Sequence, residues 1–352
     1  TLRILVFNED IQTIGAEYTR VVIFNYLIDG VAEAFGALLD ITGHEYFGLF
    51  LDIVHNVVNL SAVLCLVILV PDARLVTVGF IQLVIGAAFL VVMLAWAIFK
   101  GWYSAFWGGM LGSVAICNRQ AVKNVFLTAV PLSIGSFLEY GEWELLTFFT
   151  AYLGPAEVST WALLGTVWEL FEASTEGVGE AAAVRVAYHL GKGHPDMAEL
   201  SSYKSMLLSF ALSLFVTAGF FLCGYDLPTW FSSDETIQRM LAELIPLVGF
   251  GNITMNFGMV SWSLVGAQGR YRLATLVSMI SSWLITIPLS AIFVVGLNIN
   301  LKGLVGAVIA GYSTSSAILM YILLRSDWVR LSKIVQELNA MTGEIDSSDE
   351  ED

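Results

Sequence analysis

Long apolar runs separated by short polar loops dominate the pattern of the chain. Nine runs are long enough to cross a bilayer as helices, because about 20 apolar residues span the hydrocarbon core. They cover residues 18–40, 47–70, 75–99, 124–152, 158–184, 203–225, 237–265, 273–297 and 303–324. Residues 325–340 have the pattern of a short amphipathic helix, and an acidic segment follows at 344–352. The pattern therefore predicts an all-α integral membrane protein with about nine transmembrane helices.

The composition agrees with a membrane protein. Hydrophobic residues make up 57% of the chain and charged residues 13%, which is more apolar surface than a soluble domain of this length needs. The net charge of −15 argues against a nucleic-acid partner, since phosphate backbones require basic surfaces. Cys65, Cys117 and Cys223 lie far apart and form neither a metal motif nor a disulfide framework. We expect membrane lipid and a small molecule as partners, and no nucleic acid.

The distribution of lysine and arginine predicts the orientation of the chain. If the nine runs alternate in direction, eleven basic residues fall on one side of the membrane and five on the other. The larger set contains Lys100, Arg119, Lys123, Arg185, Lys192, Lys204, Arg270, Arg272, Arg325, Arg330 and Lys333. Because basic loops stay in the cytoplasm, the C-terminus is expected there. The plasma membrane and a vacuolar or other organellar membrane both fit this pattern.

An internal repeat adds to the predicted organisation. Phe7-x-x-Asp10, Ala16-Glu17 and Gly43 recur as Phe231-x-x-Asp234, Ala242-Glu243 and Gly269. If the second copy of the repeat begins near residue 124, the first copy extends upstream of Thr1, and the sequence is expected to be truncated at its N-terminus. The repeat then predicts twelve helices in two lobes. Residues 1–123 are the rest of the N-terminal lobe and a connector, 124–325 the C-terminal lobe, and 326–352 a cytoplasmic helix and disordered acidic tail.

Seven glutamates within two adjacent apolar runs are the strongest functional signal. They are Glu139, Glu142 and Glu144 in the first run, and Glu169, Glu172, Glu176 and Glu180 in the second. At about 100° per residue, the second group occupies roughly 80° of a helix surface, so one face is acidic. Ionisable groups at bilayer depth usually line an ion or substrate path. Alternatively, residues near the run ends, such as Glu180 close to Arg185, simply meet water or headgroups.

Several motifs around these glutamates resemble one transporter family. They are Leu138-Glu139-x-x-Glu142-Trp143-Glu144-Leu145-Leu146, Leu153-Gly154-x-x-Glu157, Gly177-x-Gly179, Leu190-Gly191-Lys192-Gly193-His194-Pro195 and, later, Gly266-Ala267-Gln268-Gly269-Arg270. In their order and spacing these motifs are similar to the seventh, eighth and later helices of multidrug and toxic compound extrusion (MATE) transporters, and to the plant and animal members most closely.

The resemblance implies an antiporter that exports organic, often cationic, compounds in exchange for protons or sodium ions. Glu139 matches the position of the usual coupling residue of eukaryotic members, and Glu144 matches a second acid of that motif. Two departures weaken the match. Thr166 stands where some members have an acid, although Glu169 follows one turn later. Asn252 and Asn256 stand in the region where members have an acid on the tenth helix. No cofactor beyond the coupling ion is implied.

The residues support this expectation on physical grounds. A carboxyl group in a partly dehydrated cavity, close to a second carboxylate, can hold a proton near neutral pH and release it when a cation enters. Trp143, between Glu142 and Glu144, is the ring most suited to a cation–π contact, whereas Tyr140, Trp161, Trp168 and Phe171 are more typical of helix packing. Asp52 and His55 belong to a polar stripe that either faces a central cleft or joins helices by hydrogen bonds.

Other function classes fit the sequence less well. An enzyme would need a nucleophile with its base or a metal cage, and neither His-Glu-x-x-His nor Gly-x-Ser-x-Gly occurs. A channel does not explain the two-lobe pattern. A flippase for lipid-linked sugars or polysaccharides, which belongs to the same superfamily, is a closer alternative. It would be expected to place arginines in the cavity, and the apolar runs contain almost none. We therefore expect a monomeric exporter of cationic or neutral compounds.

Overall fold

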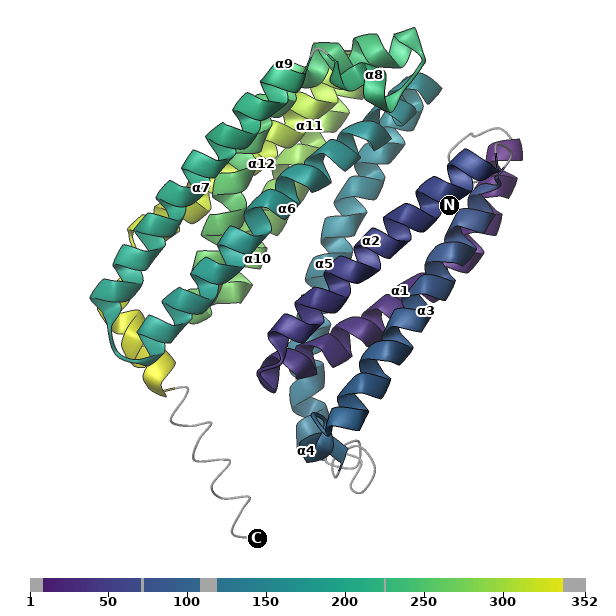
Figure 1. Cartoon of the computed structure of the whole chain (residues 1–352). Coiled ribbons are helices and arrows are strands. Elements are labelled where there is room, and N and C mark those ends of the chain that lie inside the picture. The colour runs from purple at the N-terminus through teal and green to yellow at the C-terminus, as the bar shows by residue number, and fades with distance from the viewer. Residues whose placement is uncertain (1–8, 71–72, 108–118, 225, 338–352) are drawn as a thin grey trace. The chain divides into compact units, whose positions relative to one another are not determined.

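Helices account for all regular structure in the described part of the chain. The computed structural model describes residues 9–70, 73–107, 119–224 and 226–337, and the all-α prediction is confirmed (Figure 1). The long helices are α1 (Glu9–Ile41), α2 (Glu45–Leu69), α3 (Leu75–Lys100), α5 (Arg119–Leu153), α6 (Pro155–Gly191), α7 (Pro195–Cys223), α9 (Glu235–Val265) and α12 (Leu301–Leu324). The acidic segment 344–352 and residues 108–118 of the predicted connector lie outside the described residues.

Shorter elements complete the chain. They are α4 (Ser104–Trp107), α8 (Leu227–Phe231), α10 (Tyr271–Ser281) and α11 (Ile287–Ala291), with π-helical turns at 266–270, 282–286 and 292–296. Gly269, with a φ of 76°, interrupts the helical geometry after α9. The chain turns back there, and α10 packs against both α9 and α12.

Six helical stretches in the described chain are long and apolar enough to cross a membrane. They are Gln12–Ile41, Glu45–Leu69, Leu75–Lys100, Pro195–Cys223, Glu235–Gly296 and Leu301–Leu324. The fifth is 62 residues long and contains the break at Gly269, so it covers two of the predicted runs, 237–265 and 273–297. The two runs that contain the seven glutamates form α5 and α6, which have 35 and 37 residues. The protein is therefore a multi-pass membrane protein.

The chain divides into two compact units, Thr1–Ala129 and Val130–Asp352. In the first unit α1 packs mainly against α3, whose buried Gly79 and Gly86 allow a close approach of the two backbones. The α2 helix has no buried residue. Tyr103 follows α3 and donates a hydrogen bond from its hydroxyl to the Phe35 carbonyl oxygen over 2.9 Å. Burial raises the pKa of the Tyr103 hydroxyl.

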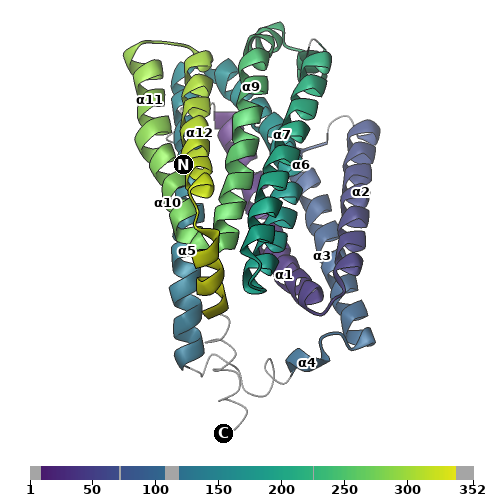
Figure 2. The same cartoon turned by 90° about the vertical axis from the view of Figure 1, so that its left-hand side faces the viewer.

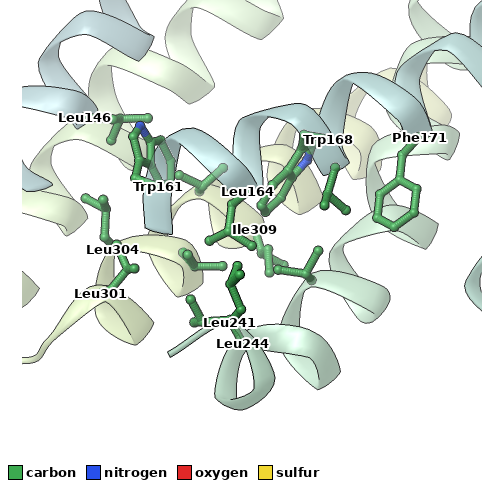
Figure 3. Packing of buried hydrophobic residues seen from close by; sticks show 14 of the residues in the cluster. Leu146, Trp161, Leu164, Trp168, Phe171, Leu241, Leu244, Leu301, Leu304 and Ile309 are labelled. Carbon is green, nitrogen blue, oxygen red and sulfur yellow. The ribbon is translucent and has the colours of Figure 1, made fainter. Parts of the chain in front are cut away.

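The second unit is built around α6 and α9. Buried side chains recur every three or four residues along α6, so one face of this helix packs inward against α7 and α9. Figure 3 shows the first apolar cluster, in which Trp161, Leu164 and Trp168 of α6 pack with leucines of α9 and α12. A second apolar cluster lies further along the same helices and includes Val186, Leu190, Leu264, Leu319 and Leu323. Apolar packing thus joins these helices at two positions along their length.

The predicted amphipathic helix is present at residues 328–337. Its apolar side buries Trp328 and Leu331, while Arg330 and Lys333 are exposed. The buried Ser332 donates a hydrogen bond from its hydroxyl to the Leu190 carbonyl oxygen over 2.8 Å. The same carbonyl group, in the last turn of α6, also accepts a hydrogen bond from the Gly193 backbone N–H over 3.1 Å. The C-terminal helix therefore closes one end of the second unit.

Candidate functional site

Glu142 is the one buried acidic side chain in the described part of the chain, with 3% of its surface exposed. It lies on α5 on the same face as Leu146 and Thr150, which are one and two turns further along and fully buried. Glu144, two residues further along the helix, is exposed. Glu139 belongs to α5, but its side chain lies outside the described ones.

Trp143 joins α5 to the core of the unit. Its ring centroid lies 5.2 Å from that of Trp161 and 6.5 Å from that of Trp168, both on α6. The Trp161 indole N–H donates to the Thr147 hydroxyl oxygen over 3.1 Å. Trp161 and Trp168 are buried within the apolar cluster (Figure 3), whereas Trp143 is only half-buried. The burial of the α6 rings agrees with a packing role, and Trp143 alone of the three keeps an accessible surface.

The acidic face of α6 adjoins its packed face. Glu169 and Glu176 are exposed, and Glu172 between them is half-buried. Glu180 is also exposed. Glu172 lies next to the buried Phe171, so it stands at the edge of the packed surface. The four carboxylates thus form an accessible strip along one side of α6, with Glu172 closest to the interior.

A buried hydrogen-bonded network crosses the unit beside this strip. The Thr175 hydroxyl of α6 donates to the Asn256 side-chain oxygen of α9. Asn256 donates from its amide nitrogen to the Asn252 side-chain oxygen over 3.1 Å, and Asn252 donates to the Thr217 hydroxyl of α7 over 2.9 Å. Thr217 donates to the Gly249 carbonyl oxygen over 3.3 Å. Three helices are therefore joined by side-chain hydrogen bonds with almost no access to solvent.

This network lies between the two apolar clusters. Along α6, Phe171 belongs to the first cluster, Thr175 to the network and Ala182 to the second cluster. Along α9 the corresponding order is Met255, Asn256 and Val260. This network, called the polar layer below, thus falls near the middle of α6. Glu172 and Glu176 are the acids on either side of Thr175. Asn252 and Asn256 were predicted from the sequence as candidate site residues, and the structure brings them next to the acidic face.

Asp52 and His55 belong to α2 in the other unit. The His55 ring packs against Phe89 of α3 with a centroid distance of 5.0 Å, and Asp52 is exposed. Their assignment to a shared site with the glutamates stays a prediction.

The sequence analysis missed the hydroxyl residues of the polar layer. Thr175 was overlooked because the glutamates around it gave the stronger signal. On α7, Ser209, Ser213 and Thr217 recur at every fourth residue within an apolar helix, and all three are buried. A stripe of small polar residues in a membrane helix indicates hydrogen bonding between helices. The four-residue spacing of these hydroxyl residues was the sequence signal that could have identified this part of the polar layer.

Comparison with known proteins adds a family match. Residues 131–292 match the sequence profile of the MatE family. An uncharacterized transporter of Schizosaccharomyces pombe is 33% identical over 217 residues, which cover 59% of this chain and 39% of the relative. Protein DETOXIFICATION 31 of Arabidopsis thaliana is 27% identical over 218 residues, which cover 59% of this chain and 41% of the relative. The chain therefore spans less than half the length of these relatives.

Solved structures show the same fold. The eukaryotic MATE transporter AtDTX14 aligns with a TM-score of 0.65 and 18% identity, over 91% of this chain and 80% of the other. A mutant of the Vibrio cholerae MATE transporter VcmN aligns with a TM-score of 0.72 and 14% identity, over 93% of this chain and 74% of the other. The helical arrangement predicted from the family resemblance is therefore confirmed at the level of fold.

Proposed function

We propose that this chain is a transporter of the MATE family and that it exports organic cations across a membrane in exchange for protons. The observation that carries the proposal is Glu142, an acidic side chain with 3% exposure in a membrane-length helix. An ionisable group at that depth is costly to keep, and in membrane proteins it usually serves an ion or substrate path. The chain is not expected to act as an enzyme.

The polar layer supports the same proposal. Substrate and ion sites of transporters with repeated halves commonly lie near the bilayer midplane. Glu172 and Glu176 stand at the middle of α6, on either side of Thr175, and the Thr175–Asn256 contact fixes this part of α6 against α9. A fixed backbone keeps the two carboxylates at a constant depth, although both remain accessible at the surface of the helix.

The coupling follows from competition for the carboxylates. A protonated carboxyl group is neutral and gives a cation no electrostatic attraction, whereas the deprotonated group attracts it. A proton and an organic cation therefore exclude each other from the same site, and their movements across the membrane become opposite. Trp143 is next to Glu142 and only partly covered by Trp161 and Trp168. Its ring would provide a cation–π surface for the transported organic cation.

Transport by vesicles tests this proposal. The protein as its gene encodes it is reconstituted with an imposed pH gradient, and uptake of a fluorescent organic cation is measured. Glu139→Gln and Glu142→Gln are each expected to abolish gradient-driven uptake, because glutamine cannot exchange a proton. Glu172→Gln or Glu176→Gln is expected to shift the pH optimum or the range of cations carried.

Glu235→Gln is the matched control, because Glu235 is exposed in the first turn of α9, away from the polar layer. It should transport at the rate of the unchanged protein. Undiminished proton-driven uptake by both the Glu139 and Glu142 variants, at equal amounts of protein in the membrane, would refute the glutamate coupling.

A further inference from the structure

A groove with two basic side chains lies along the α6–α7 hairpin. The two helices run side by side (Figures 1 and 2), and the groove between them has a volume of about 360 Å³. Arg185 lines it from α6, and Lys204, Ser201 and Ser205 line it from α7. Leu200 and Leu208 add an apolar wall. The groove is thus positively charged at one part and apolar at another.

The polar groups of this groove are available to a ligand. Within the described part of the chain, neither Arg185 nor Lys204 forms an ion pair. No acidic residue lines the groove. Ser201 is 6% exposed, and its hydroxyl makes no hydrogen bond to another described residue although it lines the groove. The Ser201 oxygen is not among the fully buried unpaired side-chain atoms of the described residues, so this hydroxyl reaches the groove and can donate a hydrogen bond to a group from outside the chain.

The groove lies near the end of the α6–α7 hairpin, where the boundary between headgroups and acyl chains is expected. With a rise of about 1.5 Å per residue, Arg185 lies about 9 Å from the end of α6, and Lys204 lies about 14 Å from the start of α7. Long basic side chains at such positions extend toward the membrane surface. The lysine and arginine distribution predicts that this end of the hairpin faces the cytoplasm, where the membrane leaflet contains anionic lipids.

We propose that this groove binds an anionic phospholipid of the cytoplasmic leaflet. Arg185 and Lys204 hold the headgroup phosphate, which also accepts a hydrogen bond from Ser201. An acyl chain lies along Leu200 and Leu208. Charge complementarity selects this occupant, because a zwitterionic lipid leaves the two positive charges only partly neutralised and a soluble anion leaves the leucines exposed. The site is separate from the glutamates, and its test does not depend on transport.

The test measures thermal stability of the purified chain in an uncharged detergent. Dioctanoyl phosphatidylserine, dioctanoyl phosphatidylcholine and sodium phosphate are titrated separately. Phosphatidylserine is expected to raise the melting temperature with a saturable dependence, and the other two are not. At about 1 kcal/mol for each basic residue, the Arg185→Gln/Lys204→Gln double variant should bind phosphatidylserine about thirtyfold more weakly.

Two further variants separate this site from a general charge effect. Lys192→Gln/Arg272→Gln removes two exposed basic residues of the same predicted side that do not line the groove, and it should bind as the unchanged chain does. Arg185→Lys/Lys204→Arg keeps both charges and should retain binding. Equal losses in the two glutamine double variants, equal stabilisation by phosphatidylcholine, or saturable stabilisation by phosphate alone would each overturn the proposal.

Discussion

The helices α1–α3 of the first unit and α9–α12 of the second are arranged on the same plan. In each set the first helix packs against the last, α1 against α3 and α9 against α12. A glycine with a φ of 76° follows the first helix in both sets, at Gly43 and Gly269. These are the two glycines that the sequence repeat aligns. The agreement in backbone conformation supports the repeat independently of the residue pattern from which it was predicted.

The two sets differ in the contacts that their first helices, α1 and α9, make. In the first set α1 approaches α3 at Gly79, beside Tyr18 and Val21, and at Gly86, beside Ile28 and Asp29. In the second set Asn252 and Asn256 of α9 are buried and bonded to α6 and α7. The comparison teaches that the backbone plan does not require buried amides. The amides are an addition in the unit that contains the acidic helices.

The largest expected effect comes from removing an amide of the polar layer. Asn256→Leu leaves the buried Asn252 side-chain oxygen without its donor and breaks the contact of the Thr175 hydroxyl with α9, although that hydroxyl can still donate to the Phe171 carbonyl oxygen over 3.2 Å. Leaving buried polar groups unpaired costs about 2 kcal/mol, so the melting temperature in detergent should fall clearly. Asn25→Leu is the matched control, because Asn25 lies on α1 of the first unit and makes no side-chain hydrogen bond with another described residue. Equal melting temperatures for the two variants would contradict the difference between the sets.

A second prediction compares the helix contacts themselves. A Cβ atom added at Gly251 of α9 would lie 2.8 Å from the Ile309 Cγ1 atom of α12, and one added at Gly79 of α3 would lie 3.2 Å from the Tyr18 Cε2 atom of α1. Gly251→Ala should therefore cost about 1.5 kcal/mol through overpacking. Gly79→Ala should cost less, because the Tyr18 ring edge needs to move only slightly. Thermal melting in detergent checks the order, and a larger loss at Gly79 would contradict it.

The sequence predicted the helices well because their signal is local. Apolar length identified α1–α3, α7, α9 and α12, and the spacing of Glu169, Glu172 and Glu176 identified the accessible face of α6. The partners across helices were not predictable in the same way. Periodicity assigns Thr175 and Asn256 to faces of their own helices, but it does not determine which residue of one helix stands opposite which residue of the other. Their contact depends on the relative shift of α6 and α9, which the whole unit determines.

The smallest effects are expected at the two turn glycines, and comparing them tests the internal repeat most directly. No atom lies within 4 Å of a Cβ atom built on Gly43 or Gly269, so substitution tests backbone conformation without a steric collision. Alanine in the left-handed region costs about 1 kcal/mol, and both Gly43→Ala and Gly269→Ala should lower the melting temperature by similar amounts. Asparagine tolerates this region better, so Gly43→Asn and Gly269→Asn should lose less. Gly165→Ala, in the interior of α6 with equally open surroundings, should instead be neutral or stabilising, because alanine favours the helix. If alanine at one turn is harmless and at the other is costly, the two glycines do not have equivalent roles, and the two sets share a helix order but not a common turn.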